Sequence, residues 1–194
     1  MQSSARHLGL IGRNGAGKSS LLRLLQGLLV PEKGSVQVER PVGLVFQNPD
    51  HQMLFPTVLE ELTFGLTERG ISAQVANQKA RTLAAQHGAA GLLPMATHEL
   101  SAGQKTLVCI LAVLMDGPQT LLLDESLANL DRISARQMTA LIRSTQTRVI
   151  FSTHQLHLLE DFDEVIWLDQ GAVRLQGKPR EVIEAYRNWS QAQC

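Results

Sequence analysis

The chain has 194 residues, enough for one well-buried domain but too few for two independent ones. Its 18 Lys and Arg residues equal its 18 Asp and Glu residues, so we expect no basic surface and no nucleic acid partner. The longest apolar run, residues 107–115, is too short to cross a bilayer, so any membrane role must come through partners.

The first quarter of the chain contains signals for three strands and one helix. Residues 6–11 are predicted to form a strand, and the leucine-rich stretch 18–28 is predicted to form a helix after a glycine-rich turn. Beyond Pro31 and Gly34, residues 35–39 alternate like an edge strand, and residues 42–46 are typical of a buried strand.

The middle of the chain is predicted to be helical. Thr57 followed by Glu60 has the spacing of a capping box, which opens a helix. Residues 72–86 and 101–116 are two further amphipathic candidates. We interpret residues 57–116 as a helical subdomain inserted into a single domain.

Strand and helix signals alternate in the last part of the chain. Residues 120–124, 148–151 and 164–168 are predicted strands, with helices beginning at Ile133 and Gln155. Alternation of this kind indicates a mostly parallel sheet.

The chain closes with a predicted turn and helix. The turn lies at residues 169–171, and Pro179 suits the first position of a helix that runs to about Trp189. The expected fold is therefore α/β, with residues 1–56 and 117–194 forming the core around the sheet.

A phosphate-binding loop lies between the first strand and the first helix. Gly12, Gly17, Lys18 and Ser19 satisfy the pattern GxxxxGK[ST], whose backbone N–H groups surround phosphate oxygens at a helix N-terminus. A plain glycine turn with a surface lysine is the alternative, and the position between strand and helix disfavours it. The residues expected to contact a nucleoside triphosphate here are Gly12, Asn14, Gly15, Ala16, Gly17, Lys18, Ser19 and Ser20.

Two carboxylates follow the predicted strand at residues 120–124. Asp124 and Glu125 lie at its carboxyl end, where open α/β sheets bind ligands. Together with the phosphate loop, they indicate a hydrolytic site in which Asp124 holds Mg²⁺ and Glu125 polarises the attacking water.

Gln47 and His154 follow two other predicted strands. Each lies where a γ-phosphate sensor would be expected. Taken alone, Gln47 is typical of a surface loop and His154 of the start of a helix.

A family resemblance decides between these readings. Leu100, Ser101, Ala102, Gly103 and Gln104 resemble the LSGGQ signature of ABC ATPases. The other motifs occur in the family's order. In chain order, the resemblance identifies residues 12–19 as Walker A, Gln47 as the Q-loop, residues 100–104 as the signature, residues 121–125 as Walker B, residues 128–131 as the D-loop and His154 as the switch histidine.

The resemblance implies a P-loop NTPase fold and an ATPase that acts as a dimer. In this interpretation Lys18, Gln47, Glu125 and His154 are catalytic, and Ser19, Gln47 and Asp124 hold Mg²⁺. Ser101, Gly103 and Gln104 would contact the ATP bound by the facing subunit, so that ATP joins a homo- or heterodimer.

Within the family, one stretch resembles the ATPases of energy-coupling factor importers of cobalt and vitamins. It comprises Phe46, Gln47, Asn48, Pro49 and Asp50, together with Gln52, Thr57, Val58, Phe64 and Gly65. The implied partners are a transmembrane coupling protein and a substrate-binding membrane component. The implied location is the cytoplasmic face of the cell membrane, which is the inner membrane in a Gram-negative cell. Cys109 and Cys194 have no metal-ligand spacing and suit a reducing cytosol.

The sequence departs from the family pattern at a few places. Ala102 replaces the first signature glycine, Ser126 replaces the usual proline, and Thr106 and Leu107 replace residues that are often basic. The resemblance also implies a shortened N-terminal β subdomain, without the aromatic residue that stacks on adenine in relatives. Base stacking is then expected from elsewhere, or adenine recognition is loose.

Two other functions are alternatives to a transport ATPase. A soluble ABC ATPase of DNA repair or translation would more often show tandem ATPase halves, a coiled-coil insert or a basic face. A phosphate-loop kinase or a nucleotide-binding module would lack the signature.

Overall fold

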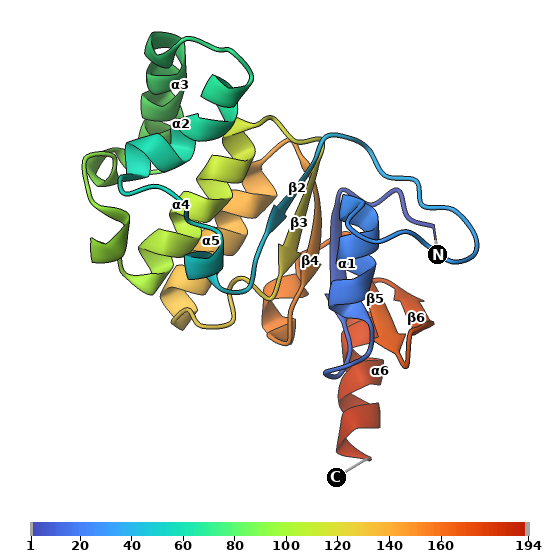
Figure 1. Ribbon diagram of the computed structural model, residues 1–194. Helices are drawn as coiled ribbons and strands as arrows, with labels where there is room; N and C mark the ends of the chain where they lie inside the picture. Colours follow the sequence, from blue (N-terminus) through green and yellow to red (C-terminus); the bar gives the residue numbers. More distant parts are fainter. Residues whose placement is uncertain (1, 193–194) are drawn as a thin grey trace.

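The computed structural model describes residues 2–192 and has an α/β architecture built on one sheet (Figure 1). The strand order is β2-β3-β4-β1-β5-β6, with all pairs parallel except β5 and β6. The strands are β1 (His7–Ile11), β2 (Val42–Val45), β3 (Thr120–Asp124), β4 (Arg148–Ser152), β5 (Glu164–Asp169) and β6 (Ala172–Gly177). The parallel strands place their carboxyl ends at one edge of the sheet, where the phosphate loop begins.

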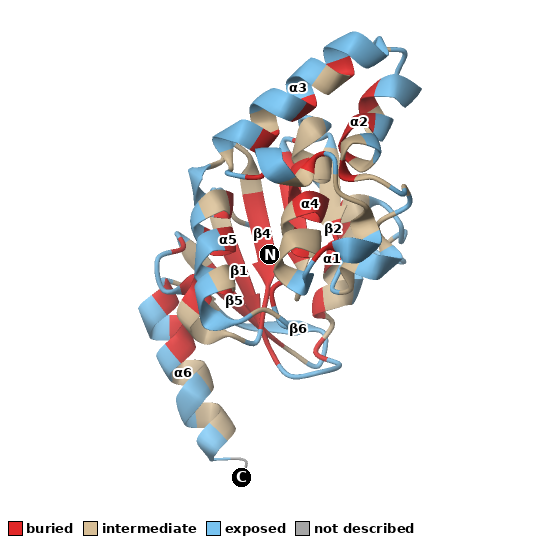
Figure 2. Ribbon diagram, turned by 90° about the vertical axis from the view of Figure 1, so that its left-hand side faces the viewer, coloured by how far each residue is buried: buried red, intermediate tan, exposed pale blue. Residues whose placement is uncertain are grey.

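Helices cover both faces of the sheet. The six α-helices within residues 2–192 are α1 (Lys18–Gln26), α2 (Val58–Glu68), α3 (Ala73–Gln86), α4 (Ala102–Met115), α5 (Arg132–Ser144) and α6 (Pro179–Gln191). Leu22 and Leu25 of α1 pack on one face, against β1, β3 and β4. Buried residues of α4, α5 and α6 pack on the other face, so the central strands are buried on both sides (Figure 2).

Helices α2 and α3 pack against α4 in a second hydrophobic core. Leu62 of α2 and Ala80 of α3 pack against Val108 and Leu111 of α4. Cys109 and Ile110, on the opposite side of α4, belong to the core beneath the sheet, and burial raises the pKa of the Cys109 thiol to about 12. One helix therefore lies in both hydrophobic cores and connects α2 and α3 to the sheet.

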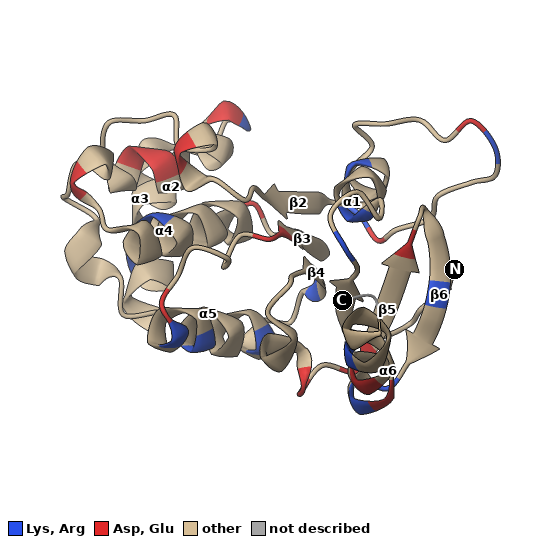
Figure 3. Ribbon diagram, turned by 90° about the horizontal axis from the view of Figure 1, so that it is seen from below, with Lys and Arg blue, Asp and Glu red and all other residues tan. Residues whose placement is uncertain are grey.

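Charges separate along the surface although the net charge is zero (Figure 3). The acidic residues Glu60 and Glu61 lie in the first turn of α2, whereas α5 carries Arg132, Arg136 and Arg143. Glu60 completes the predicted capping box by accepting from the Thr57 N–H. Acidic side chains at this end also complement the helix dipole.

Most predicted elements are confirmed within two residues, and Pro179 is the first residue of α6 as expected. The edge strand predicted at residues 35–39 is wrong, because this largely exposed segment forms no ladder with any strand of the described chain. In an extended segment without a neighbouring strand, the backbone N–H and C=O groups form hydrogen bonds with water instead.

Three further differences concern the edges of the sheet. Residues 42–46 were predicted to be buried, but β2 pairs only with β3, and Val45 alone in the strand is buried. The helix predicted from Gln155 is a 3-10 segment, Leu156–Leu159, because the chain must enter β5 at Glu164. The sequence reading also missed β6, whose alternating Val173 and Leu175 are exposed on an edge strand.

Candidate nucleotide-binding site

The phosphate loop depends on glycine at two positions. Gly12 has φ +152°, and a Cβ there would lie 2.3 Å from the Leu168 carbonyl oxygen. Gly17 has φ +100° and is the N-cap residue of α1. Its carbonyl oxygen accepts a hydrogen bond from the Leu21 N–H in that helix. The loop can therefore lie against the end of β5 and present the positive end of α1 to an anion.

Lys18 is the buried cation of the loop. Its side chain is 5% exposed, and its ammonium donates to the carbonyl oxygens of Gly12 at 2.8 Å and Arg13 at 3.2 Å. The Lys18 Nζ also lies 3.4 Å from the Glu125 Oε1. The ammonium is therefore oriented by the loop and paired with the carboxylate expected to act in hydrolysis.

Glu125 has an uncommon backbone conformation. Its φ is +50°, in the left-handed region that residues with side chains seldom adopt. The Glu125 N–H donates to the Ser152 carbonyl at 2.9 Å, and its Oε1 lies 2.8 Å from the His154 Nε2. This conformation brings the ends of β3 and β4 together around one carboxylate.

Ser19 and Asp124 face each other across the same edge of the sheet. The Ser19 hydroxyl donates to the Asp124 Oδ1 at 3.1 Å. Burial raises the pKa of Asp124, and this hydrogen bond opposes the rise. A hydroxyl and a carboxylate at this distance are hard oxygen donors, and they fit the ligand preference of Mg²⁺.

A cavity of about 400 Å³ gathers most of the predicted residues. Gln47 reaches it from the end of β2 and Glu125 from the end of β3. The loop residues that line it are Asn14, Gly15, Ala16, Gly17, Lys18, Ser19 and Ser20. Gly12 lies just behind this lining through its contact with Lys18.

The signature residues lie apart from that cavity. Ser101 is the exposed N-cap of α4, where its hydroxyl accepts from the Gln104 N–H and the Gln104 side chain accepts from the Ser101 N–H. Gly103 lies in the same first helical turn. None of these three lines the phosphate-loop cavity of its own chain. The fold therefore separates these two groups of predicted residues.

The family model described as ABC transporter matches residues 3–128. This range includes most of the motifs identified in the sequence. The chain belongs to the ABC transporter family. It is thus an ATP-binding, ATP-hydrolysing subunit whose turnover is coupled to transport, on the fold expected of a P-loop NTPase.

Among the relatives of this ABC ATPase is the biotin transport ATP-binding protein BioM of Rhodobacter capsulatus. The two are 38% identical over 96% of this chain and 85% of the relative. The energy-coupling factor transporter ATP-binding protein EcfA1 of Bacillus licheniformis is 32% identical over 93% of this chain and 70% of the relative. The solved structure of cbiO1 from Clostridium perfringens, described as part of the ABC transporter complex cbiONQ, has a TM-score of 0.85. The two chains are 28% identical, and the match covers 95% of this chain and 82% of the cbiO1 chain.

An ion pair that the sequence did not reveal connects the segment after Gln47 to α4. The Lys105 Nζ lies 2.6 Å from the Asp50 Oδ1, and Lys105 is one residue beyond the signature. The two residues are 55 positions apart, and no local pattern pairs them. In this ABC ATPase, the segment after Gln47 and helix α4 are therefore in direct contact.

The departures from the family pattern have different surroundings. Ala102 is exposed at the first position of α4. Ser126 is 4% exposed, and its hydroxyl has no hydrogen-bond partner within residues 2–192. A buried hydroxyl without a partner costs stability, whereas a proline ring would carry no such group.

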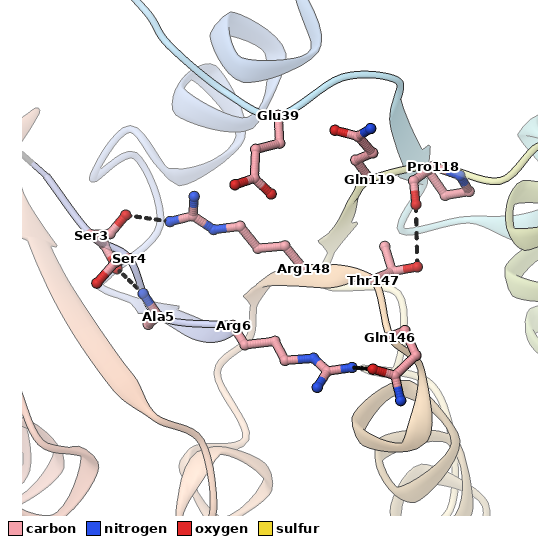
Figure 4. A pocket seen from close by; sticks show the side chains of 10 residues that line it. All are labelled: Ser3, Ser4, Ala5, Arg6, Glu39, Pro118, Gln119, Gln146, Thr147 and Arg148. Atoms are coloured by element: carbon pink, nitrogen blue, oxygen red, sulfur yellow. Dashed lines mark hydrogen bonds between the residues drawn. The ribbon is translucent and has the colours of Figure 1, made fainter.

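A larger cavity, of about 610 Å³, lies at the opposite edge of the sheet (Figure 4). Arg6 and Arg148 extend into this region from the starts of β1 and β4; Arg6 donates to the Gln146 amide oxygen and Arg148 to the Ser3 carbonyl. It contains none of the predicted site residues. The predicted catalytic residues therefore lie away from this cavity, at the carboxyl edge of the sheet.

No helix in the described part of the chain combines the length and the apolar character needed to cross a bilayer.

Proposed function

We propose that the chain powers an energy-coupling factor importer of a vitamin or a metal ion. The names of its relatives support this class, since they include a biotin transport ATP-binding protein and an energy-coupling factor ATPase. In this proposal a homo- or heterodimer of ATPase subunits works on the cytoplasmic face of the cell membrane, which is the inner membrane in a Gram-negative cell. A transmembrane coupling protein and a substrate-binding membrane component complete the complex.

The observation that carries the hydrolytic role is the convergence of Lys18, Glu125 and His154. Glu125 lies 3.4 Å from Lys18 and 2.8 Å from His154. Phosphate oxygens entering the loop would replace Glu125 as the partner of Lys18. The released carboxylate then accepts a proton from the water that attacks the γ-phosphorus, and the bond to the bridging oxygen of ADP breaks.

The remaining residues would hold the reacting groups in place. His154 would contact the γ-phosphate and the attacking water, and Gln47 would orient that water from the far side of the cavity. Ser19, Gln47 and Asp124 would hold Mg²⁺, which when bound neutralises charge on the β and γ phosphate oxygens. The loop residues Gly12, Asn14, Gly15, Ala16, Gly17 and Ser20 would surround the phosphates.

The exposed amino end of α4 supports the dimer. Ser101, Gly103 and Gln104 belong to a helix N-terminus that lies outside the phosphate-loop cavity of its own chain. In a facing arrangement, these groups would contact the γ-phosphate held by the other subunit. ATP would then stabilise the dimer, and hydrolysis would release it.

Contact with the membrane partner would involve the helical subdomain, residues 57–116, and the segment that leads into it. Leu54 is 73% exposed, and the partly exposed ring of Phe64 packs against Phe55. Replacing Leu54 with Glu should abolish transport while ATP hydrolysis by the isolated subunit remains. Residues 1–56 and 117–194 would act as the nucleotide-binding core that drives this segment.

Purification from native membranes tests the proposal directly. A tagged Glu125→Gln chain, with ATP present, should copurify with a transmembrane coupling protein and a small substrate-binding membrane protein. The control is Glu160→Gln, purified in parallel, because it makes the same substitution at an exposed residue and should not trap an ATP-bound dimer. A chain that stays wholly in the soluble fraction and carries nucleic acid would instead indicate a soluble ABC ATPase.

A further inference from the structure

The segment that contains Gln47 has little packing to fix its position. Val45 and Val58 are buried, but none of residues 46–57 between them is buried. A cavity of about 200 Å³ is lined by part of this segment, by the first turns of α4 and by residues that follow β3. A surface segment with few buried contacts moves easily, so specific polar contacts must hold it in place.

The part of this segment around Gln47 closes on itself. The Phe46 N–H donates to the Gln52 amide oxygen at 3.0 Å. The Asp50 N–H donates to the Asn48 amide oxygen, also at 3.0 Å. Gln47 lies within the loop that these two hydrogen bonds close. A displacement of Asp50 should therefore displace Gln47 as well.

Two contacts attach this loop to one face of α4. The Lys105 Nζ lies 2.6 Å from the Asp50 Oδ1, and the Cys109 Sγ lies 3.9 Å from the Pro49 carbonyl oxygen. Lys105 and Cys109 are four residues apart on the helix, so their side chains are neighbours on its surface. A thiol is a weak donor, which makes the ion pair the stronger of the two attachments.

Neither element offers a substitute for the two charges of this ion pair. Lys105 is the only Lys, Arg, Asp or Glu of α4, and Asp50 is the only Asp or Glu in residues 46–59. The Lys105 side chain is 20% exposed, whereas that of Asp50 is 61% exposed. A partly buried pair is screened less by salt than a fully exposed one.

We propose that Lys105 is a positioning residue that holds Gln47 at the phosphate-loop cavity through its ion pair with Asp50. This inference rests on the proposed function, in which Gln47 orients the attacking water. Gln47 lines both the phosphate-loop cavity and the cavity beside the ion pair. A small displacement of an orienting group slows the chemical step. The contacts of the phosphates with residues 12–19 would remain.

The first experiment removes each charge of the pair. Lys105→Met and Asp50→Asn should each lower kcat by about three- to fivefold and leave the KM for ATP unchanged. The matched control is Arg143→Met, which removes the surface ion pair of α5 with Asp161 and should leave kcat unchanged. An unchanged kcat in Lys105→Met, or a change in KM alone, would overturn the proposal.

The second experiment exchanges the charges. Lys105→Asp and Asp50→Lys each place like charges opposite one another and should lower kcat more than the neutral variants do. The chain with both changes restores the attraction and should recover most of the lost kcat. A double variant no faster than the slower single variant would contradict the proposal.

Thermal unfolding shows which of these chains fold. If a charge-reversed chain does not fold, the neutral variants decide, because Lys105→Met combined with Asp50→Asn should lose no more activity than either change alone. Losses that multiply in this combination would show that the two residues act independently, and the proposal would be wrong.

The third experiment tests whether Lys105 acts through Gln47. In a Gln47→Ala chain, Lys105→Met should have no further effect on kcat. The ATP-dependent dimer should persist in Lys105→Met, because the capping box of Ser101 with Gln104 is unchanged. An equal further loss of kcat, or loss of the dimer, would overturn the proposal. Absence of hydrolysis in the unmodified protein would instead refute the proposed function.

Discussion

The phosphate loop and the amino end of α4 both offer helix N-termini, yet their surroundings differ. At the loop, the buried Lys18 ammonium has four partners in its own chain: two loop carbonyls, His154 and Glu125. At α4, the exposed Ser101 is satisfied only by its capping box with Gln104. The phosphate loop is a buried network in which Lys18 can change partners, whereas the amino end of α4 is an exposed surface.

This difference indicates how work is divided in the proposed dimer. A network that already pairs Lys18 with Glu125 can respond to phosphate by exchanging partners within one subunit. The exposed end of α4 lies outside the phosphate-loop cavity of its own chain, so in this proposal it binds phosphate only when a second subunit supplies it. Substitutions in the first region should therefore change chemistry, and those in the second should change association.

The largest effect is expected from Glu125→Gln. Loss of the carboxylate that accepts the proton should lower the hydrolysis rate by about 100- to 10,000-fold, while ATP binding and dimer formation persist. Phosphate release and size-exclusion chromatography with ATP measure the two properties. The same change at the exposed Glu160 should have no effect. An unchanged hydrolysis rate in Glu125→Gln would remove this residue as the base.

A slightly smaller effect on turnover, with an added loss of binding, is expected from Lys18→Ala. The ammonium would contact phosphate in both the ground state and the transition state, so affinity and rate should fall together, the rate by about 100-fold or more. Calorimetry and a phosphate assay measure both quantities. The exposed Lys79→Ala is the control. Tight ATP binding by Lys18→Ala would contradict the assignment.

Substitution at Gly103 tests the open region. Gly103→Asp should retain ATP binding by the monomer but prevent the ATP-dependent dimer, because a carboxylate at the end of α4 repels the facing γ-phosphate. A Cβ at Gly103 meets only the Ser134 side chain, at 3.5 Å, so the variant should fold. Gly103→Ala controls for loss of the glycine.

A mixture of two inactive chains makes the comparison sharper. If the dimer is symmetric, mixing equal amounts of Lys18→Ala and Gly103→Asp should recover activity, up to about half of that of the unmodified protein, because each mixed dimer contains one intact composite site of two. Activity that stays at background for the mixture would indicate that each site is complete within one subunit.

The smallest effect is expected from Asp124→Asn in the nucleotide-free protein. Because burial raises the pKa of Asp124 in the folded state, the folded protein binds this proton more tightly than the unfolded chain. Stability from this group is therefore lost as pH rises through the window between the unfolded and folded pKa values. Asp124→Asn should raise the Tm by a few degrees at neutral pH and by progressively less in acid.

Thermal unfolding across a pH series measures this change. The amide can still accept from the Ser19 hydroxyl, so the hydrogen bond is a matched feature of both proteins. Lower stability of Asp124→Asn at neutral pH would show that the carboxylate is stabilising before any metal binds.

The sequence by itself determined the helices, the central strands and the identity of nearly all proposed site residues. These depend on local signals: glycines before Lys18, a capping box at Thr57, another at Ser101, and apolar runs that end in carboxylates. Such signals act over a few residues, where backbone conformation and capping are decided by near neighbours. They also revealed the order of the motifs, and hence the family.

Tertiary structure alone decided how those residues meet. Residues 35–39 alternate correctly but have no adjacent strand, and β2 is exposed because it lies at an edge. The Lys105–Asp50 ion pair, the contact of Glu125 with Lys18, and the gathering of Trp167, Tyr186 and Trp189 join residues far apart in the chain. No periodicity encodes such pairs, since they arise from the sheet order that aligns strand ends and from the packing of helices on its faces.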